Sequence, residues 1–520
     1  MPQPATRPTT ESTRTLATAR APMNKPTRIH RVLLVNPFTF QGDNPNIGMD
    51  PVVSRHAGQE IKTGVTLPIG LCYMAAVLLE KGFEVKLLDP LAEKIPVRDI
   101  LEAARWSDAI ITPFSAQHVD DIQKFMGIYR DKLRILVGTY AKHIPEKLFG
   151  QDFGDIILAS EPEFLIAELL QAWPGISQVN GILYYDDDTQ RIVRTTPSPP
   201  IANIDSIPFP ARFLVNPKNY WDISFFGEPT TWLLPTRGCP YSCNFCAQFD
   251  LNEKAVRYRS PKNIADEIDQ VVRESGVRNF VFFDETFNLN AKFVSAVCEE
   301  ILARQLNIRW WCAARADLVK RDVVRLMKKA GCIEMRFGLE SANDEILKYL
   351  QKDLTVEGIR RGCTICNEEG MNFSLQCILG TPMETEATIA NTMQFIKDMR
   401  PLYVSFNVLT PLPGSQLFNQ LKDKLDLDTV RSFDILHTNF PFGKFSGAEL
   451  DGIVRRCYLG YYFSPTFLLK IIKTAIAQPH MVFGIAKTMV RQARYLIRSI
   501  VFHTSKDAAK ELAAHPPQAV

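Results

Sequence analysis

Residues 237–246 have the sequence Arg-Gly-Cys-Pro-Tyr-Ser-Cys-Asn-Phe-Cys, and the rest of the chain is interpreted outward from this stretch. Its cysteines, Cys239, Cys243 and Cys246, are spaced C-x3-C-x2-C in a loop that contains Gly and Pro and follows the apolar run 231–234. Thiolates this close in sequence converge on one metal centre. In a cubane iron–sulfur cluster, three such ligands leave one iron open, and an open iron can bind a substrate.

A zinc site, an electron-transfer cluster and simple core packing all fit these cysteines less well. A structural zinc site takes four protein ligands, usually as two separated pairs, and neither Cys nor His occurs between residues 247 and 297. An electron-transfer cluster would also need a fourth thiolate. Buried cysteines without a metal are common in protein cores, but three at this spacing in a Gly/Pro loop are not typical of packing.

The spacing, with Phe245 directly before the last cysteine, resembles the signature of the radical S-adenosylmethionine (SAM) superfamily. The resemblance implies that the three cysteines bind a [4Fe-4S] cluster and that the amino and carboxylate groups of SAM chelate its open iron, beside Phe245. In that family the reduced cluster passes one electron to SAM, and the resulting 5′-deoxyadenosyl radical abstracts hydrogen from an unactivated carbon. A one-electron reductant, such as flavodoxin or ferredoxin, is then an implied partner.

Strand-like and helical patterns alternate from about residue 231 to 420, which predicts a partial (β/α)6 barrel of the TIM type. The active site of such a barrel lies at the carboxyl ends of its strands. Asp284 and Glu285 end the apolar run 279–283, where carboxylates suit an ammonium group, although either acid alone also suits a helix N-cap. Arg315 can form a two-pronged contact with a carboxylate.

The family resemblance assigns six residues of this region to SAM. They are Asp284 and Glu285 for its amino group, Arg315 for its carboxylate or ribose, Glu340 for its ribose, and Gly380 and Glu384 in the segment that cradles its adenine. Glu340 lies at the end of the predicted strand 332–341, where a buried carboxylate is costly without a partner, so function is favoured over core packing. Gly380 would let the ligand approach the backbone.

Residues 29–196 also alternate strand-like and helical patterns. The strand-like runs are 31–37, 83–89, 108–113, 134–138 and 155–159. Alternation of this kind predicts a doubly wound, Rossmann-like parallel sheet, with any ligand at the carboxyl ends of the strands.

The sequence segments 67–71, 137–146 and 160–163 resemble the cobalamin-binding domain that precedes the radical SAM domain in one large subgroup of the superfamily. The anaerobic magnesium-protoporphyrin ester cyclases and the carbon and phosphorus methylases belong to that subgroup. The resemblance implies cobalamin as a cofactor and assigns to it Pro68, Gly70, Ser115, Gly138 and Glu161.

The cobalamin resemblance has departures. The Asp-x-His-x-x-Gly motif that supplies an axial histidine in other cobalamin proteins is absent, because residues 117–121 are Gln-His-Val-Asp-Asp. The segment 137–140 lacks a second Gly, and Ser160 replaces a Gly. The resemblance therefore does not extend to a histidine ligand on cobalt. A Rossmann-like domain that has lost its cofactor and only covers the barrel is the alternative.

Three segments lie outside these two regions. Residues 1–28, rich in Pro, Thr and Ala, predict a disordered tail; the composition also resembles a transit peptide, and Met23 is an alternative initiator. Residues 197–230 contain seven prolines and predict a linker. Residues 421–520 predict a helical, basic C-terminal region.

The C-terminal region has no acidic residue between 452 and 506. Lys487, Arg491, Arg494 and Arg498 share one face of a predicted helix, a pattern typical of a helix on an anionic membrane surface. A solvated face packed against the barrel is the alternative. No apolar run reaches 18 residues, so no transmembrane helix is predicted.

Composition is that of a soluble multidomain protein. The 520 residues are 46% hydrophobic and 22% charged, with a net charge of +3. Eleven cysteines without a disulfide framework predict a reducing, cytoplasmic location. The basic C-terminal helices add peripheral membrane contact to this expectation. Cys363 and Cys366 lie in a helical pattern and are interpreted as packing residues.

The function implied by the resemblance is that of a cobalamin-dependent radical SAM methyltransferase. Methylcobalamin, reloaded by a second SAM, would methylate an unactivated carbon of an apolar lipid, tetrapyrrole or natural product. Radical ring formation or oxidation without net methylation is one alternative, and a non-catalytic cobalamin or iron–sulfur sensor is another. The near-complete set of SAM positions disfavours a sensor, which would not need them. No nucleic-acid partner is expected.

Overall fold

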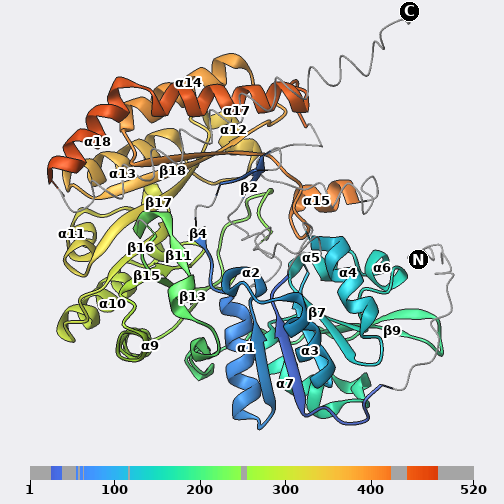
Figure 1. Ribbon diagram of the computed structural model, residues 1–520. Helices are drawn as coiled ribbons and strands as arrows, with labels where there is room; N and C mark the ends of the chain where they lie inside the picture. The colour runs from blue at the N-terminus through green and yellow to red at the C-terminus, as the bar shows by residue number, and fades with distance from the viewer. Residues whose placement is uncertain are drawn as a thin grey trace, which may run out of the picture.

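The structure, a computed structural model, shows two α/β halves joined by an extended segment, with further helices at the C-terminal side (Figure 1). The residues it describes are 25–37, 54–56, 59–61, 64–114, 118–225, 227–247, 254–422 and 442–477. The first half is built on a seven-stranded sheet and the second on a six-stranded parallel sheet. These sheets confirm the predicted α/β class, with the Rossmann-like half preceding the barrel half.

The first sheet has the strand order β10-β9-β8-β7-β6-β1-β5. Its strands are β1 (Arg31–Val35), β5 (Glu84–Leu88), β6 (Ala109–Pro113), β7 (Leu133–Val137), β8 (Ile156–Leu158), β9 (Ile182–Asp186) and β10 (Arg191–Arg194). The strands from β5 to β8 are parallel, whereas β9 and β10 are antiparallel. The order reverses between β1 and β6, and the crevice at the carboxyl ends there is the usual ligand site of such sheets.

The hairpin of β9 and β10 was not predicted from the sequence. Only Ile182 and Leu183 of β9 are buried, and β10 begins and ends with the exposed residues Arg191 and Arg194. An edge hairpin of this kind lacks the continuous apolar run that marks a central parallel strand.

Helices cover both faces of the first sheet, as a doubly wound fold requires. Val32 and Leu34 of β1 belong to one apolar cluster, and Leu33 and Val35 belong to the cluster on the opposite face. The first face carries α1 and α7, and the second carries α3, α4 and α6. The helices of this half are α1 (Ile69–Glu80), α2 (Pro90–Glu93), α3 (Val97–Trp106), α4 (Val119–Ile128), α5 (Thr139–His143), α6 (Pro145–Gly150) and α7 (Pro162–Ala172).

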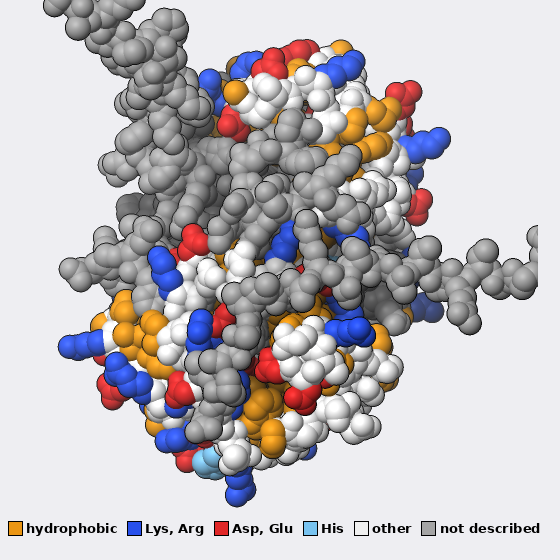
Figure 2. Space-filling view, turned by 90° about the vertical axis from the view of Figure 1, so that its right-hand side faces the viewer, with side chains coloured by type: hydrophobic (Ala, Val, Ile, Leu, Met, Phe, Trp, Pro, Cys, Tyr) orange, Lys and Arg blue, Asp and Glu red, His pale blue; other side chains and the backbone are white. Residues whose placement is uncertain are grey.

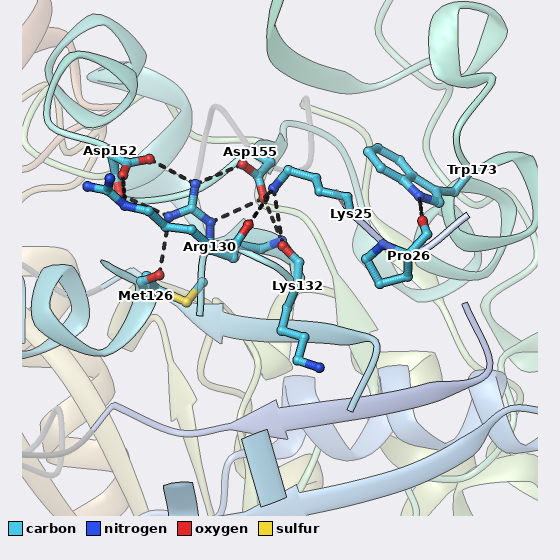
Figure 3. Close-up of polar contacts among 9 residues, drawn as sticks. Lys25, Pro26, Met126, Arg130, Lys132, Asp152, Asp155 and Trp173 are labelled. Carbon is cyan, nitrogen blue, oxygen red and sulfur yellow. Dashed lines mark hydrogen bonds and ion pairs between the residues drawn. The ribbon is translucent and has the colours of Figure 1, made fainter. Parts of the chain in front are cut away.

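The chain before β1 is held against this domain by polar contacts (Figure 3). Lys25 pairs with Asp155 at 2.5 Å and donates to the Lys132 carbonyl at 3.1 Å. Asp155 also pairs with the buried Arg134 at 2.8 Å, and the Trp173 indole donates to the Pro26 carbonyl at 2.7 Å. The predicted tail over 1–28 therefore overlaps with residues that pack on the domain from Lys25 onward.

The second sheet has the sequential order β12-β15-β16-β17-β18-β19, with every neighbouring pair parallel. Its strands are β12 (Thr230–Leu233), β15 (Asn279–Phe282), β16 (Arg309–Ala314), β17 (Cys332–Glu340), β18 (Asn372–Leu379) and β19 (Tyr403–Val408). The outer helices are α9 (Pro261–Ser275), α10 (Ala291–Ala303), α11 (Arg321–Lys329), α12 (Asp344–Tyr349), α13 (Val356–Glu368), α14 (Glu386–Met399) and α15 (Gln416–Leu421). This is the partial (β/α)6 arrangement predicted from the sequence.

Side-chain alternation in β17 separates the helix-covered face from the barrel interior. Met335, Phe337 and Leu339 belong to the apolar core that also contains Cys363 and Cys366 of α13. Their alternating neighbours, which include Glu334 and Glu340, point to the other side because successive side chains on a strand face opposite ways. Burial of both α13 cysteines confirms their interpretation as packing residues.

The Pro-rich segment between the halves is packed rather than loose. Arg212 donates to the Trp232 carbonyl at 2.7 Å and pairs with the buried Glu267 at 2.5 Å. Asp222, in the short strand β11 (Trp221–Asp222), pairs at 3.0 Å with Arg336 of β17. β11 also pairs with β4 (Gly64–Val65), and a further hairpin joins β2 (Ser54–His56) to β3 (Gln59–Ile61).

The C-terminal region begins with two helices, α17 (Gly447–Tyr462) and α18 (Pro465–Ala477). Leu450, Ile453 and Tyr461 of α17 join the barrel core. The predicted basic helix at 487–498 lies outside the described residues. In the described parts of the chain, no helix is long and apolar enough to cross a membrane. Figure 2 shows Lys and Arg side chains intermixed with Asp and Glu side chains on one face.

Candidate functional site

Two short antiparallel strands close the cysteine loop at its base. They are β13 (Thr236–Arg237) and β14 (Arg257–Tyr258), which pair with each other. Gly238 has φ +101°, and a Cβ there would lie 2.3 Å from the Ala255 carbonyl oxygen, so only glycine fits between the two ends of the loop. The loop therefore leaves the barrel just beyond the carboxyl end of β12, as predicted.

The cysteines themselves are half-buried within this loop. The Cys246 N–H donates to the Cys243 carbonyl at 3.1 Å, and burial raises the pKa of the Cys243 thiol to about 11, against the effect of Lys352. Among the described residues, no three His, Cys, Asp or Glu side chains converge on a position for a single metal ion. A cubane takes its thiolates on different irons. Three half-buried thiols in one closed loop therefore suit a cubane cluster, whose ligands do not have to converge on a single ion.

Asn244, between the second and third cysteines, fixes the top of the loop. Its side-chain amide donates to the Tyr349 carbonyl at 2.7 Å, and its backbone N–H donates to the Leu350 carbonyl at 3.1 Å. Its own carbonyl accepts from the Leu417 N–H at 3.0 Å. Phe245 packs into a small apolar cluster that includes Leu350. The loop is thus attached to the end of α12 and the start of α15.

Arg315 supports the loop from the third barrel strand. Its guanidinium stacks on the Tyr241 ring, 3.7 Å from the ring centroid, and donates two hydrogen bonds of 3.1 Å to Asp317. It also donates to the Lys352 and Asp353 carbonyls at 3.0 and 2.5 Å. These contacts place the Arg315 guanidinium against the cysteine loop.

Glu340, at the end of β17, forms a buried ion pair with Lys352. The Nζ–Oε1 distance is 2.6 Å, and the two side chains are 13% and 7% exposed for lysine and glutamate. Although burial opposes it, Glu340 and the Cys243 thiol raise the pKa of Lys352 above its usual value. Glu340 has φ +56°, a strained conformation for a residue with a Cβ. A Cβ at Gly338 would lie 2.3 Å from Glu340 Oε1 and 2.6 Å from Lys352 Nζ.

Asp284 and Glu285 lie against the strand that enters the cysteine loop. Asp284 Oδ1 accepts from the Thr236 N–H at 2.7 Å and from its hydroxyl at 3.0 Å. Asp284 Oδ2 is buried without a hydrogen-bond partner in the described part of the chain, and burial raises the pKa of this carboxyl well above its usual value. Burial also raises the pKa of Glu285, which accepts a hydrogen bond from the Gly238 N–H.

Gly380 and Glu384 form a tight turn after β18. The Glu384 carboxylate accepts a hydrogen bond from the Gly380 N–H, and the backbone of Thr381 is also hydrogen-bonded to it. Burial raises the pKa of Glu384 to about 7. Gly380 has φ +88°, which explains glycine at this position. The predicted adenine-side pair is therefore in contact, and the carboxylate shapes the turn.

The residues predicted to contact cobalamin lie on different elements of the first domain. Pro68 precedes α1, Gly70 has open space around its Cα, and Gly138 follows β7 with φ +108°. Glu161 instead lies in a buried contact with Arg257 and Arg237 of the β13–β14 hairpin. Ser115 lies outside the described residues.

The carboxyl edges of the two sheets face each other. Gly414, after β19, has φ +97°, and a Cβ there would lie 2.9 Å from Thr139 Cγ2 and 3.5 Å from Ala247 Cβ. Thr139 directly follows Gly138, and Ala247 directly follows Cys246. Phe418 of α15 packs into the apolar core of the first domain. The expected ligand edge of the first domain therefore lies beside the cysteine loop (Figure 1).

Some side chains of the barrel strands are exposed and could contact a ligand. Gln376 of β18 is exposed although its neighbours Leu375 and Cys377 are in the core. Ser405 faces Gln376 in register, and Asn407 lies one alternation further along β19. Phe283, directly after β15, is 52% exposed. The interior offers amides, a hydroxyl and one aromatic ring to a ligand.

Comparison with known proteins agrees with this geometry. A sequence model described as the radical SAM superfamily matches residues 233–396, from the end of β12 to α14. Residues 233–396 belong to the radical SAM superfamily. The chain is related to the cobalamin-dependent radical SAM methylases and the magnesium-protoporphyrin cyclases.

Two curated relatives and one solved structure illustrate the relationship. An uncharacterized methyltransferase of Pyrococcus horikoshii is 27% identical over 78% of this chain and 90% of its own length. The anaerobic magnesium-protoporphyrin IX monomethyl ester cyclase of Cereibacter sphaeroides is 28% identical over 78% of this chain and 69% of its own. The radical SAM methyltransferase TsrM of Kitasatospora setae, solved with cobalamin and a [4Fe-4S] cluster, shares the fold: TM-score 0.59, 17% identity, and coverage of 76% of this chain and 75% of that one.

Several residues of this radical SAM protein's site were not predicted from the sequence. Lys352 and Tyr241 carry no pattern of their own, and Asn244 resembles an ordinary loop residue. Lys352 follows Glu340 by 12 positions, across a turn and a helix, and only the fold brings the two together. A lysine placed between two predicted elements was the one available signal.

Proposed function

We propose that this protein is a cobalamin-dependent radical SAM enzyme that transfers a methyl group to an unactivated carbon. The observation that carries the proposal is the apposition of the two carboxyl edges. Thr139 of the first domain and Ala247 of the cysteine loop both approach Gly414. A cobalamin at the first edge and a cluster with SAM at the second would face each other across this junction.

In this proposal, Cys239, Cys243 and Cys246 hold the [4Fe-4S] cluster, and the loop is kept in place by Asn244 and Arg315. Lys352, which is influenced by Cys243 and paired with Glu340, would offer a cation for the SAM carboxylate, and Glu340 would hold a ribose hydroxyl. When bound, the cluster supplies one electron for the cleavage of SAM and cobalamin carries a methyl group. The protein binds, orients and shields these groups.

Methyl transfer is favoured over ring formation because the methyltransferase relative is matched over 90% of its length, whereas the cyclase is matched over 69%. The barrel interior supports a substrate with both polar and apolar parts. Gln376 and Asn407 would meet hydrogen-bonding groups, and Phe283 an apolar or ring portion. A flavodoxin- or ferredoxin-like protein would supply the electron.

The test is anaerobic reconstitution with iron, sulfide and cobalamin, followed by quantitation of all three and incubation with titanium(III) citrate as reductant and SAM carrying a deuterated methyl group. We expect one cluster and one cobalamin per chain, 5′-deoxyadenosine formation, and label appearing on cobalamin. Cys243→Ala should lose the cluster, while the matched control Cys366→Ala, in the buried core of α13, should keep it. A cluster without bound cobalamin would overturn the proposal, and bound cobalamin that never acquires label would favour cyclisation.

A further inference from the structure

A buried group of four charged side chains joins the first domain to the base of the cysteine loop. Glu161 and Glu163 come from the start of α7, and Arg237 and Arg257 from β13 and β14. The two Arg257 Nη atoms donate to the two Glu161 oxygens, both at 2.8 Å. Arg237 donates to Glu161 at 3.2 Å and to Glu163 at 2.5 Å. All four side chains are at most 12% exposed.

The two arginines lie at the two ends of the cysteine loop. Arg237 and Arg257 are register partners in the hairpin, so every residue of the loop lies between them. Cys239 is only two positions beyond Arg237. A displacement of this hairpin relative to α7 would therefore move the loop base together with the first cysteine.

Glu161 also joins the linker to this contact. Its Oε2 accepts from the Ile201 N–H at 2.7 Å, and Arg257 donates to the Ile201 carbonyl at 2.7 Å. Both oxygens of Glu161 are thus occupied, although the sequence assigned this residue to cobalamin. Burial opposes it, but the hydrogen bonds from Arg257 and Ile201 lower the pKa of Glu161, so the group is a carboxylate at neutral pH.

The charges in the group balance, since two carboxylates face two guanidiniums. Bidentate pairing between arginine and a carboxylate fixes orientation as well as distance, which a single lysine contact would not do. Ion pairs that only stabilised the fold would not need to contact both ends of the cysteine loop. Because this group contacts both ends, we assign it a role in positioning the loop.

We propose that Glu161 and Glu163 are positioning residues, which set the cysteine loop in a fixed register against the carboxyl edge of the first domain. The inference rests on the proposed function, because it concerns the alignment of cobalamin with SAM. It predicts that a substitution in this group slows a reaction step between the two domains more than a step that takes place within the barrel. Misplacement by about 1 Å can slow a reaction by orders of magnitude.

The test compares Glu161→Gln with wild type in the reconstituted enzyme, with titanium(III) citrate as reductant. Formation of S-adenosylhomocysteine requires SAM to reach cobalamin across the junction, whereas 5′-deoxyadenosine forms within the barrel. We expect the first rate to fall about tenfold or more, with a much smaller fall in the second and with iron and cobalamin contents unchanged. Glu84→Gln, which alters a surface contact with His30 in the same domain, is the matched control and should change neither rate.

A second measurement uses the cofactor-free protein. Hydrogen–deuterium exchange at Ile201 and at the β13–β14 hairpin should accelerate in Glu161→Gln, because the carboxylate that accepts from Ile201 and from both arginines is lost. Equal losses in both rates, or a lower unfolding midpoint with both rates unchanged, would overturn the inference. Failure of the proposed function is separate, because it would appear first in wild type as missing cobalamin or missing label. If Glu161→Gln does not fold, the milder Glu163→Gln carries the same prediction.

Discussion

At the scale of single residues, the site depends on close approaches that exclude larger side chains. Gly338 is the clearest case, because its missing Cβ makes room for the Glu340–Lys352 pair. The turn at Gly380 is a second close contact, because the buried Glu384 carboxylate accepts a hydrogen bond from the Gly380 N–H. Each observation leads to a prediction.

Gly338→Ala should break the geometry of the Glu340–Lys352 pair. The added methyl would lie 2.3 Å from Glu340 Oε1, so one partner must move. Overpacking costs about 1–3 kcal/mol, and we expect SAM affinity to fall about tenfold, measured by titration calorimetry on the reconstituted protein. Gly452→Ala, on a helix surface with open space, is the control. Unchanged SAM binding by Gly338→Ala would show that the pair does not contact SAM.

Glu384 should make stability depend on pH. Its folded pKa of about 7 lies above the ordinary 4.5, so between these values the folded protein holds a proton that the unfolded chain has released. Rising pH then favours unfolding, by up to about 1.4 kcal/mol per pH unit. Across this window wild type should lose stability relative to Glu384→Gln, and the difference should level off above pH 7. Denaturation of the cofactor-free proteins measures it; a constant difference would contradict the assignment.

At the scale of elements, the cysteine loop is held by neighbours that are distant in sequence. Asn244 binds the end of α12 and the start of α15, and Arg315 binds Tyr241 from the third barrel strand. These contacts attach the described part of the loop to three separate elements of the barrel half.

Asn244→Ala should lower the iron content after reconstitution. The substitution leaves the Tyr349 carbonyl without its donor and removes one attachment of the loop, at a cost of about 1–2 kcal/mol. Iron and sulfide analysis beside a thermal unfolding curve gives both effects. Asn391→Ala, at an exposed amide on α14, should leave iron content unchanged. Full iron loading in Asn244→Ala would mean that the loop is ordered by other contacts.

The sequence was informative at this scale wherever patterns are local. Buried strands such as β1 and β15 are continuous apolar runs, and the cysteine spacing is a short motif, so both were predicted. The partners of Arg315 and Glu161 were not, because their contacts join segments separated by 38 and 96 positions. A charged residue at a strand end suits a ligand and a domain contact equally well. Only the fold distinguishes the two.

At the scale of the whole molecule, the two carboxyl edges meet at Gly414. Gly414→Ala should separate them, because a Cβ would lie 2.9 Å from Thr139 Cγ2. Gly82→Ala is a matched control: Gly82 also has positive φ, +82°, but has open space around it. We expect cobalamin affinity to fall about tenfold in Gly414→Ala only, measured by equilibrium dialysis. If both variants lost cobalamin affinity equally, backbone strain and not separation of the two edges would be the cause.

The most direct test of the facing arrangement is the electron paramagnetic resonance spectrum of reconstituted protein that contains cob(II)alamin and a reduced cluster. Both centres are paramagnetic, and in the proposed arrangement they occupy facing edges. We predict a spectrum broadened by magnetic coupling, which returns to two simple signals when either centre is omitted. A spectrum equal to the sum of the two isolated signals would contradict the claim that the domains hold their cofactors face to face.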